Sequence, residues 1–242
     1  MLKIEYNENV DILCEKFSNA VLEIILKNQS LGLKTSVGLC GGKTPERFYK
    51  SLAAASNSDK ALKIDWAGVY FFMGDERAVP LDSEESNYKN AVKNLCGGSK
   101  IPASSVAPID FGHSSHAESA AAYEREILTK TRCGKFDLLI LGIGSDGHTA
   151  SLFERTLHGC AGTFISHYVP KLSAVRYTLT PSALGKSKNI FALAAGNEKK
   201  SVLSRAMSNE TAADEIPASM IFKNVKNRSV TLFTDIKVDK NR

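Results

Sequence analysis

The sequence of 242 residues has no apolar run that approaches the roughly 18 residues needed to cross a membrane. Its N-terminus, MLKIEYNENV, also lacks an apolar core of signal-peptide length. The few cysteines are widely spaced and form no C-x-x-C pair; they are Cys14, Cys40, Cys96, Cys133 and Cys160. These absences argue against a membrane protein, a secreted disulfide scaffold and a structural metal centre. They predict a reduced, soluble protein of the cytoplasm.

The chain also lacks internal repeats, low-complexity linkers and any compositional break that would mark a domain boundary. We therefore expect residues 1–242 to form a single domain, which is long enough to bury a large core. Lys and Arg exceed Asp and Glu only by 31 to 26, a net charge of +5, and outside the tail Lys223–Arg242 they are scattered. This charge suits an anionic small molecule. Since nucleic-acid-binding proteins cluster their basic residues, we expect no nucleic-acid partner.

Strand-like segments alternate with helical segments along the chain. Helical spacing and helix-start signals predict helices over 10–28, 45–55, 86–95, 117–132, 181–186 and 198–207. Short β-branched, aliphatic or aromatic runs predict strands over 35–40, 69–73, 136–141, 176–179, 189–194 and 229–233. This alternation predicts an α/β fold with a mainly parallel sheet and helices on both faces.

The stretch 138–153, LLILGIGSDGHTASLF, contains a buried strand followed by a glycine-rich turn, and we expect a helix to begin at Thr149. Open α/β folds bind ligands at the carboxyl ends of their strands. Asp146 and His148 in this turn are therefore candidate catalytic residues, because an imidazole takes up a proton near neutral pH. Gly144 would let a substrate approach the backbone, whose N–H groups could stabilise an oxyanion. The alternative is that the turn only caps the helix, which leaves His148 unexplained.

A second glycine turn follows the strand predicted over 35–40 and reads Gly41, Gly42, Lys43 and Thr44. It is similar to the nucleotide-binding P-loop, but the leading glycine would have to stand at Val37, and Gly38 is one residue too late. We expect Thr44 to be the N-cap and Pro45 the first residue of a helix, whose N-terminal N–H groups form a site for one phosphate. An ordinary tight turn is the alternative.

Charged side chains follow two other strands. Asp75, Glu76 and Arg77 come directly after a buried run; the arginine could bind a phosphate bidentately, and an acid could orient it or the substrate. The alternative is an internal ion pair that braces the loop. Lys199 lies in the first turn of a predicted helix, where it opposes the helix dipole unless an anion lies between them. Arg176, within VRYTLT, is a similar candidate, and a solvated side chain is the alternative for both.

Other patterns favour structural roles. His113 and His116 have H-x-x-H spacing, but they lie in a Ser/Gly-rich loop without a third ligand, so we predict no metal site. Gly142, Gly144 and Gly147 nearly spell the dinucleotide-binding G-x-G-x-x-G, but late in the chain and in a turn that carries a histidine. The sequence contains no G-x-S-x-G nucleophile elbow, and no cysteine lies in a sequence context typical of a catalytic nucleophile. This argues against a hydrolase that forms a covalent intermediate on serine or cysteine.

Five segments together resemble the 6-phosphogluconolactonase family, in the family's order: CGGKTPERFY, FFMGDERAVPLDSEESNY, LGIGSDGHTASLF, VRYTLT and GNEK. The resemblance extends from about Val37 to Phe233. It implies a NagB/RpiA-like, modified Rossmann fold and hydrolysis of 6-phospho-D-glucono-1,5-lactone to 6-phospho-D-gluconate, the second step of the oxidative pentose phosphate pathway. It implies neither a metal nor another cofactor. The departures are Cys40, where the family often has Ser, Glu154, where it usually has Pro, and a poor match over 155–171.

The chemistry of the residues and the resemblance agree on a mechanism. His148 would act as general base on the water that attacks the lactone carbonyl, with Asp146 holding or charging its imidazole. Asp75 would contact sugar hydroxyls or assist in proton transfer. The phosphate of the substrate would be bound by basic side chains and turn atoms, namely Arg77, Lys199, Arg176 and the turn 41–44, with the backbone N–H groups of the glycine turns stabilising the oxyanion.

Two other functions compete with this one. An aldosamine-6-phosphate isomerase/deaminase on the same fold would carry a carboxylate five residues after the histidine, where this chain has Phe153, with its acid at Glu154. That family also reads DEY where this chain reads DER. A non-catalytic sugar-phosphate sensor would keep the phosphate ligands without needing Asp146 or His148. For the partner we expect a small phosphorylated sugar lactone, and the protein itself to be a monomer or weak homodimer.

Overall fold

A computed structural model of the chain describes residues 1–156, 161–208, 210–223 and 228–238. Cys160 and part of the segment 155–171 therefore lie outside the described residues, as do residues 224–227 and 239–242 of the Lys-rich tail. Within the described ranges, no helix combines the length and apolar character needed to span a bilayer.

The centre of the fold is a seven-stranded sheet in which every neighbouring pair of strands is parallel. In spatial order its strands are β1 (Leu2–Tyr6), β10 (Ser229–Thr234), β9 (Asn189–Ala194), β6 (Leu138–Gly142), β2 (Thr35–Leu39), β3 (Val69–Met73) and β5 (Val106–Ala107). This confirms the predicted α/β fold with its mainly parallel sheet. The first strand and the very short β5 have no counterpart among the predicted strands.

Helices cover both faces of the sheet, so its central strands are apolar on both sides. In β6, Leu138 and Ile140 belong to one core, and Leu139 and Leu141 belong to the other. The core around Leu138 packs under α1 (Val10–Ser30) and α2 (Lys43–Ala55), and the other packs under α4 (His116–Lys130), α5 (Pro181–Lys186), α6 (Lys200–Met207) and α7 (Ser219–Phe222). The alternation explains why β6 reads as an unbroken apolar run.

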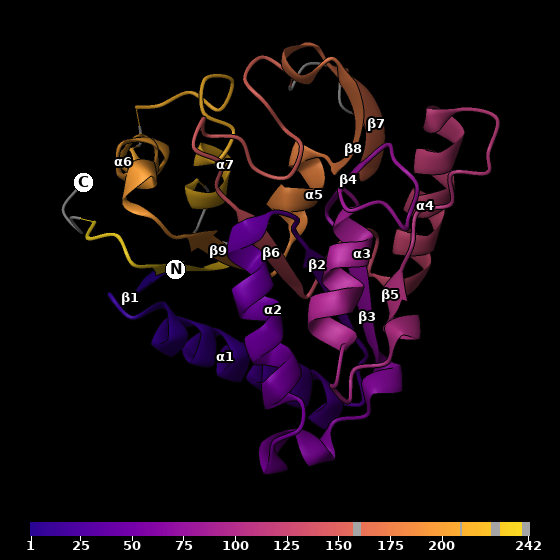
Figure 1. The fold of residues 1–242 in the computed structure, drawn as a ribbon, viewed down its shortest axis with the longest axis vertical. Helices are drawn as coiled ribbons and strands as arrows, with labels where there is room; N and C mark the ends of the chain where they lie inside the picture. The colour runs from indigo at the N-terminus through magenta and orange to yellow at the C-terminus, as the bar shows by residue number, and fades with distance from the viewer. Residues whose placement is uncertain (157–160, 209, 224–227, 239–242) are drawn as a thin grey trace.

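A second, antiparallel sheet was not predicted. It consists of β4 (Asp75–Arg77), β8 (Ala174–Leu179) and β7 (Phe164–Val169), in that order. In Figure 1, β7 and β8 lie at one end of the molecule, above α2 and α3 (Asn87–Ala91). The predicted turn after β3 is therefore an edge strand, β4, and the predicted strand over 176–179 belongs to this second sheet.

Two predicted helix starts are wrong. No helix follows the turn at His148, because Gly147 and Ala150 have φ of +86° and +50°, outside the helical region. Residues 149–152 instead form an isolated bridge between Thr149 and Leu152. The second helix begins at Lys43 rather than Pro45, with Gly42 and not Thr44 as its N-cap residue. The other predicted helices are confirmed to within a few residues, including the cap of α3, where the Ser86 hydroxyl accepts the Lys89 N–H at 3.1 Å.

Candidate active site

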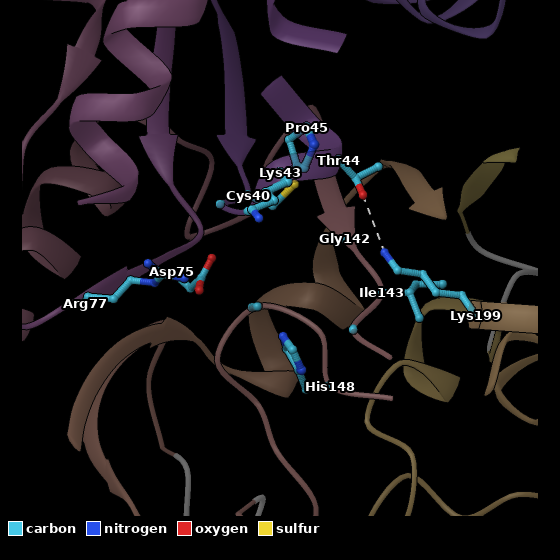
Figure 2. A pocket seen from close by; sticks show the side chains of 14 residues that line it. Cys40, Lys43, Thr44, Pro45, Asp75, Arg77, Gly142, Ile143, His148 and Lys199 are labelled. Atoms are coloured by element: carbon cyan, nitrogen blue, oxygen red, sulfur yellow. Dashed lines mark hydrogen bonds between the residues drawn. The ribbon is translucent and has the colours of Figure 1, made fainter. Parts of the chain in front are cut away.

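A cleft of about 260 Å³ lies at the carboxyl edge of the parallel sheet, where the ends of β2, β3 and β6 meet. Figure 2 shows its labelled side chains arranged around one space, with His148 opposite the turn after β2. The cleft is lined by most of the predicted residues: Gly41, Gly42, Lys43, Thr44, Asp75, Arg77, Gly144, His148 and Lys199. Asp146 and Arg176 do not line it. Its other lining residues are Cys40, Pro45, Gly142, Ile143 and Ala150.

Asp146 lies behind His148 and holds its ring. The distance between His148 Nδ1 and Asp146 Oδ1 is 2.5 Å, and Lys171 Nζ donates to the other carboxylate oxygen, Oδ2. Burial alone would raise the pKa of Asp146, but the hydrogen bonds from Lys171 and His148 outweigh it and lower that pKa well below its usual range. The carboxylate is therefore ionised at neutral pH, and Nδ1 of His148 is the donor in this pair.

Lys171 is a site residue that the sequence did not reveal. It belongs to the short 3₁₀ turn Pro170–Leu172 between β7 and β8, and its side chain is 62% exposed. Its position over Asp146 depends on the antiparallel sheet, which brings together residues that are 25 apart in the chain.

The turn around His148 is held by its own backbone. The Gly144 N–H donates to the His148 carbonyl at 2.9 Å, and the Gly147 N–H donates to the Gly144 carbonyl at 3.0 Å. These two N–H groups are thus occupied, which contradicts the expectation that they stabilise an oxyanion. The His148 ring also stacks on Phe153, with 4.6 Å between ring centroids and 29° between ring planes.

The two acids after β3 have different roles. Glu76 is buried and accepts the backbone N–H groups of Arg77, Asn87 and Tyr88 at 2.7 to 2.8 Å. It therefore braces the loop by binding backbone, not through the expected ion pair with Arg77. Burial raises the pKa of Glu76, and these backbone donors counteract the rise. Asp75, in contrast, lines the cleft.

Arg77 and Arg176 are register partners across β4 and β8. Arg77 Nη1 donates to the Glu85 carbonyl at 2.7 Å, and the residue lines the cleft. Arg176 Nη1 donates to the carbonyl of Val175 at 3.2 Å. Burial lowers the pKa of Arg176, and the charge of Arg77 adds to this effect. Arg176 therefore adds a positive charge next to Arg77 without lining the cleft itself.

Lys199 lies on the other side of the cleft from Arg77 in Figure 2, beside the turn after β2. Its Nζ lies 3.5 Å from Thr44 Oγ1, which joins the turn after β9 to the start of α2. Burial lowers the pKa of Lys199. Because Gly42 caps α2 without a side chain, the first N–H groups of this 13-residue helix have no side-chain acceptor at its cap. This half of the cleft combines an ammonium group with a helix N-terminus.

The two histidines with H-x-x-H spacing lie outside the cleft. His113 Nε2 is 3.7 Å from Asp110 Oδ2, and His116 Nδ1 is hydrogen-bonded to the Tyr177 hydroxyl at 2.7 Å. Among the residues that the structure describes, no three His, Cys, Asp or Glu side chains are grouped so that they could hold a metal ion.

Comparisons with known proteins show which family the chain is similar to. A family model described as glucosamine-6-phosphate isomerases/6-phosphogluconolactonase matches residues 8–231. The 6-phosphogluconolactonase of Thermotoga maritima is 37% identical over 193 residues, which cover 78% of this chain and 80% of that protein. The one of Chlamydia pneumoniae is 31% identical over 217 residues, 86% of this chain and 81% of that protein. The crystal structure of the Thermotoga maritima enzyme superposes with a TM-score of 0.74 at 30% identity, over 97% of this chain and all of that one.

Proposed function

Because the chain belongs to the glucosamine-6-phosphate isomerase/6-phosphogluconolactonase family, we propose that it hydrolyses 6-phospho-D-glucono-1,5-lactone to 6-phospho-D-gluconate. In metabolism this is the second step of the oxidative pentose phosphate pathway. The observation that carries the proposal is the His148–Asp146 pair. Its imidazole lines a cleft whose opposite side holds Lys199 and the N-terminus of α2, which together could bind an anion.

His148 acts as the general base. Since the ionised Asp146 accepts the Nδ1–H at 2.5 Å, the neutral ring carries no proton on Nε2, which is free to take one. A water molecule transfers a proton to Nε2 as its oxygen bonds to the lactone carbonyl carbon. When the tetrahedral intermediate collapses, the bond from that carbon to the ring oxygen breaks, and the imidazolium returns its proton to that oxygen. The product is the open-chain acid.

The phosphate lies between Lys199 and the N-terminus of α2. The ammonium group, the Thr44 hydroxyl and the first N–H groups of the helix converge there, and together they suit a dianion. Arg77 supplies a second cation across the cleft, and Arg176 strengthens the positive field behind it. Asp75 accepts hydrogen bonds from sugar hydroxyls. The oxyanion is stabilised from the turn after β2, because the Gly144 and Gly147 N–H groups are already occupied.

An isomerase/deaminase activity is disfavoured by the environment of His148. The position where that activity would need a carboxylate holds Phe153, whose ring covers the imidazole. Glu154 is exposed and lies 3.4 Å from Arg155 Nε. The only carboxylate in contact with His148 among the described residues is Asp146. An aromatic ring at this position has no proton to transfer.

The test is a coupled assay with freshly generated 6-phosphogluconolactone, corrected for spontaneous hydrolysis. We expect His148→Ala to lose about two to four orders of magnitude in kcat, while His113→Ala, an exposed histidine outside the cleft, keeps wild-type turnover. Ammonia release from glucosamine 6-phosphate by the wild type would favour the deaminase instead. Calorimetric binding of 6-phosphogluconate without any turnover of the lactone would favour a sensor.

A further inference from the structure

Ser151 is buried, only 2% exposed, and does not line the cleft, but it contacts Asp75, which does. Its hydroxyl donates to Asp75 Oδ2 at 3.0 Å, across 76 residues of sequence. Asp75 is itself 8% exposed, and Figure 2 shows its carboxylate directed into the cleft. A buried carboxylate oxygen needs a hydrogen-bond donor, and the Ser151 hydroxyl supplies one.

The backbone of Ser151 is fixed on both sides. Its N–H donates to Thr178 Oγ1 at 3.2 Å, and Thr178 is the register partner of Asp75 across β4 and β8. Its carbonyl is 2.9 Å from Nε2 of His167, on the neighbouring strand β7. Because a carbonyl only accepts, Nε2 of His167 carries the proton in this bond. The preceding residue, Ala150, has a φ of +50°, a conformation that these bonds help to maintain.

We propose that Ser151 is a positioning residue that holds the Asp75 carboxylate in its cleft-facing orientation, and that His167 fixes Ser151 from behind. The proposal rests on the function proposed above, in which Asp75 contacts the sugar. All three strands of the antiparallel sheet take part in this arrangement. Asp75 lies on β4, Thr178 of β8 accepts the Ser151 N–H, and His167 of β7 donates to the Ser151 carbonyl. One Asp75 oxygen is occupied by Ser151, and the other is left for substrate.

A double-mutant cycle tests whether Ser151 acts through Asp75. In the coupled lactone assay, we expect Ser151→Ala to lower kcat/KM by about ten- to a hundredfold, the effect of removing one hydrogen bond to a carboxylate. In an Asp75→Ala background the same change should lower it less than about twofold. Equal losses in both backgrounds would mean that Ser151 acts independently of Asp75. An Asp75→Ala variant as active as the wild type would likewise overturn the proposal.

A second pair of variants tests His167 and serves if Ser151→Ala does not fold. The amide of His167→Gln can still donate to the Ser151 carbonyl, whereas His167→Leu cannot. We expect near-normal kcat/KM for the first and a loss of about three- to tenfold for the second. Equal activities for the two variants would remove His167 from the proposal.

A crystal structure of Ser151→Ala separates this proposal from the proposed function. If the wild type fails to hydrolyse the lactone, the proposed function falls, but the structure still decides whether Ser151 holds the acid. A rotated or disordered Asp75 side chain in the variant supports the proposal. An unchanged Asp75 conformation overturns it.

Discussion

Replacing Gly144 by alanine should inactivate the protein without unfolding it. A Cβ atom at this position would lie 2.2 Å from both Cε1 and Nδ1 of His148 and 2.9 Å from Asp146 Oδ1. Ordinary van der Waals contact begins near 3.4 Å, so the imidazole has to move by about 1 Å. Its Nδ1 would then leave the carboxylate oxygen that it now approaches to 2.5 Å. Gly144 is not among the positive-φ residues, so the backbone itself tolerates alanine.

A catalytic group displaced by about 1 Å costs about a hundredfold in rate, so we expect kcat of Gly144→Ala to fall at least that far. The control is Gly185→Ala in α5, outside the cleft, because nothing lies within 4 Å of its added Cβ. We expect this control to keep kcat within about threefold, and both variants to melt within a few degrees of the wild type. Full activity of Gly144→Ala would refute the assignment of the His148–Asp146 pair as the base.

Three further predictions follow from single contacts. Lys171→Met removes a hydrogen bond to the carboxylate that holds the His148 ring, so kcat should fall by about two- to fivefold, the effect of one exposed ion pair. An unchanged kcat contradicts this. Lys199→Met should raise KM for the phosphorylated lactone by tenfold or more with a smaller change in kcat, because its cation faces the phosphate; an unchanged KM would exclude it. Burial raises the pKa of the Cys40 thiol to about 12, so iodoacetamide at pH 8 should label the exposed Cys133 and leave Cys40 unmodified. Peptide mass mapping measures this, and rapid labelling of Cys40 would show that the cleft is more open.

The parallel sheet and the cleft at its carboxyl edge could be predicted because the sequence patterns that indicate them are local. Apolar runs such as Leu138–Leu141 stand out wherever both faces of a strand are covered, and the glycine turns after β2 and β6 mark where the strands end. Parallel strands bring those ends to one edge, which is why most of the predicted residues line one cleft. The match to the family model and to the Thermotoga maritima structure confirms the predicted NagB/RpiA-like fold.

The helix expected from Thr149 shows where local signals fail. The residues HTASLF are compatible with a first helical turn, but their hydrogen-bond partners lie elsewhere: Thr149 Oγ1 donates to the Gly142 carbonyl at 2.9 Å, and the Ser151 N–H and hydroxyl donate to Thr178 and Asp75. These tertiary bonds replace the intrahelical ones. The pairing of Arg176 with Arg77 across β4 and β8 is likewise a tertiary contact that no local pattern indicates.

The residues of the candidate site fall into a group that could be predicted from the sequence and a group, held by the antiparallel sheet, that could not. The groups proposed to meet substrate follow parallel strands, so motifs of a few residues identify them. The groups that orient them come from β7, β8 and the turn between these strands: Lys171 on Asp146, and His167 and Thr178 on Ser151. Each of these contacts joins residues 16 to 27 apart in the chain, and no local pattern encodes it. The groups proposed to react can therefore be found from short motifs, whereas the contacts that set their charge and orientation depend on the tertiary fold.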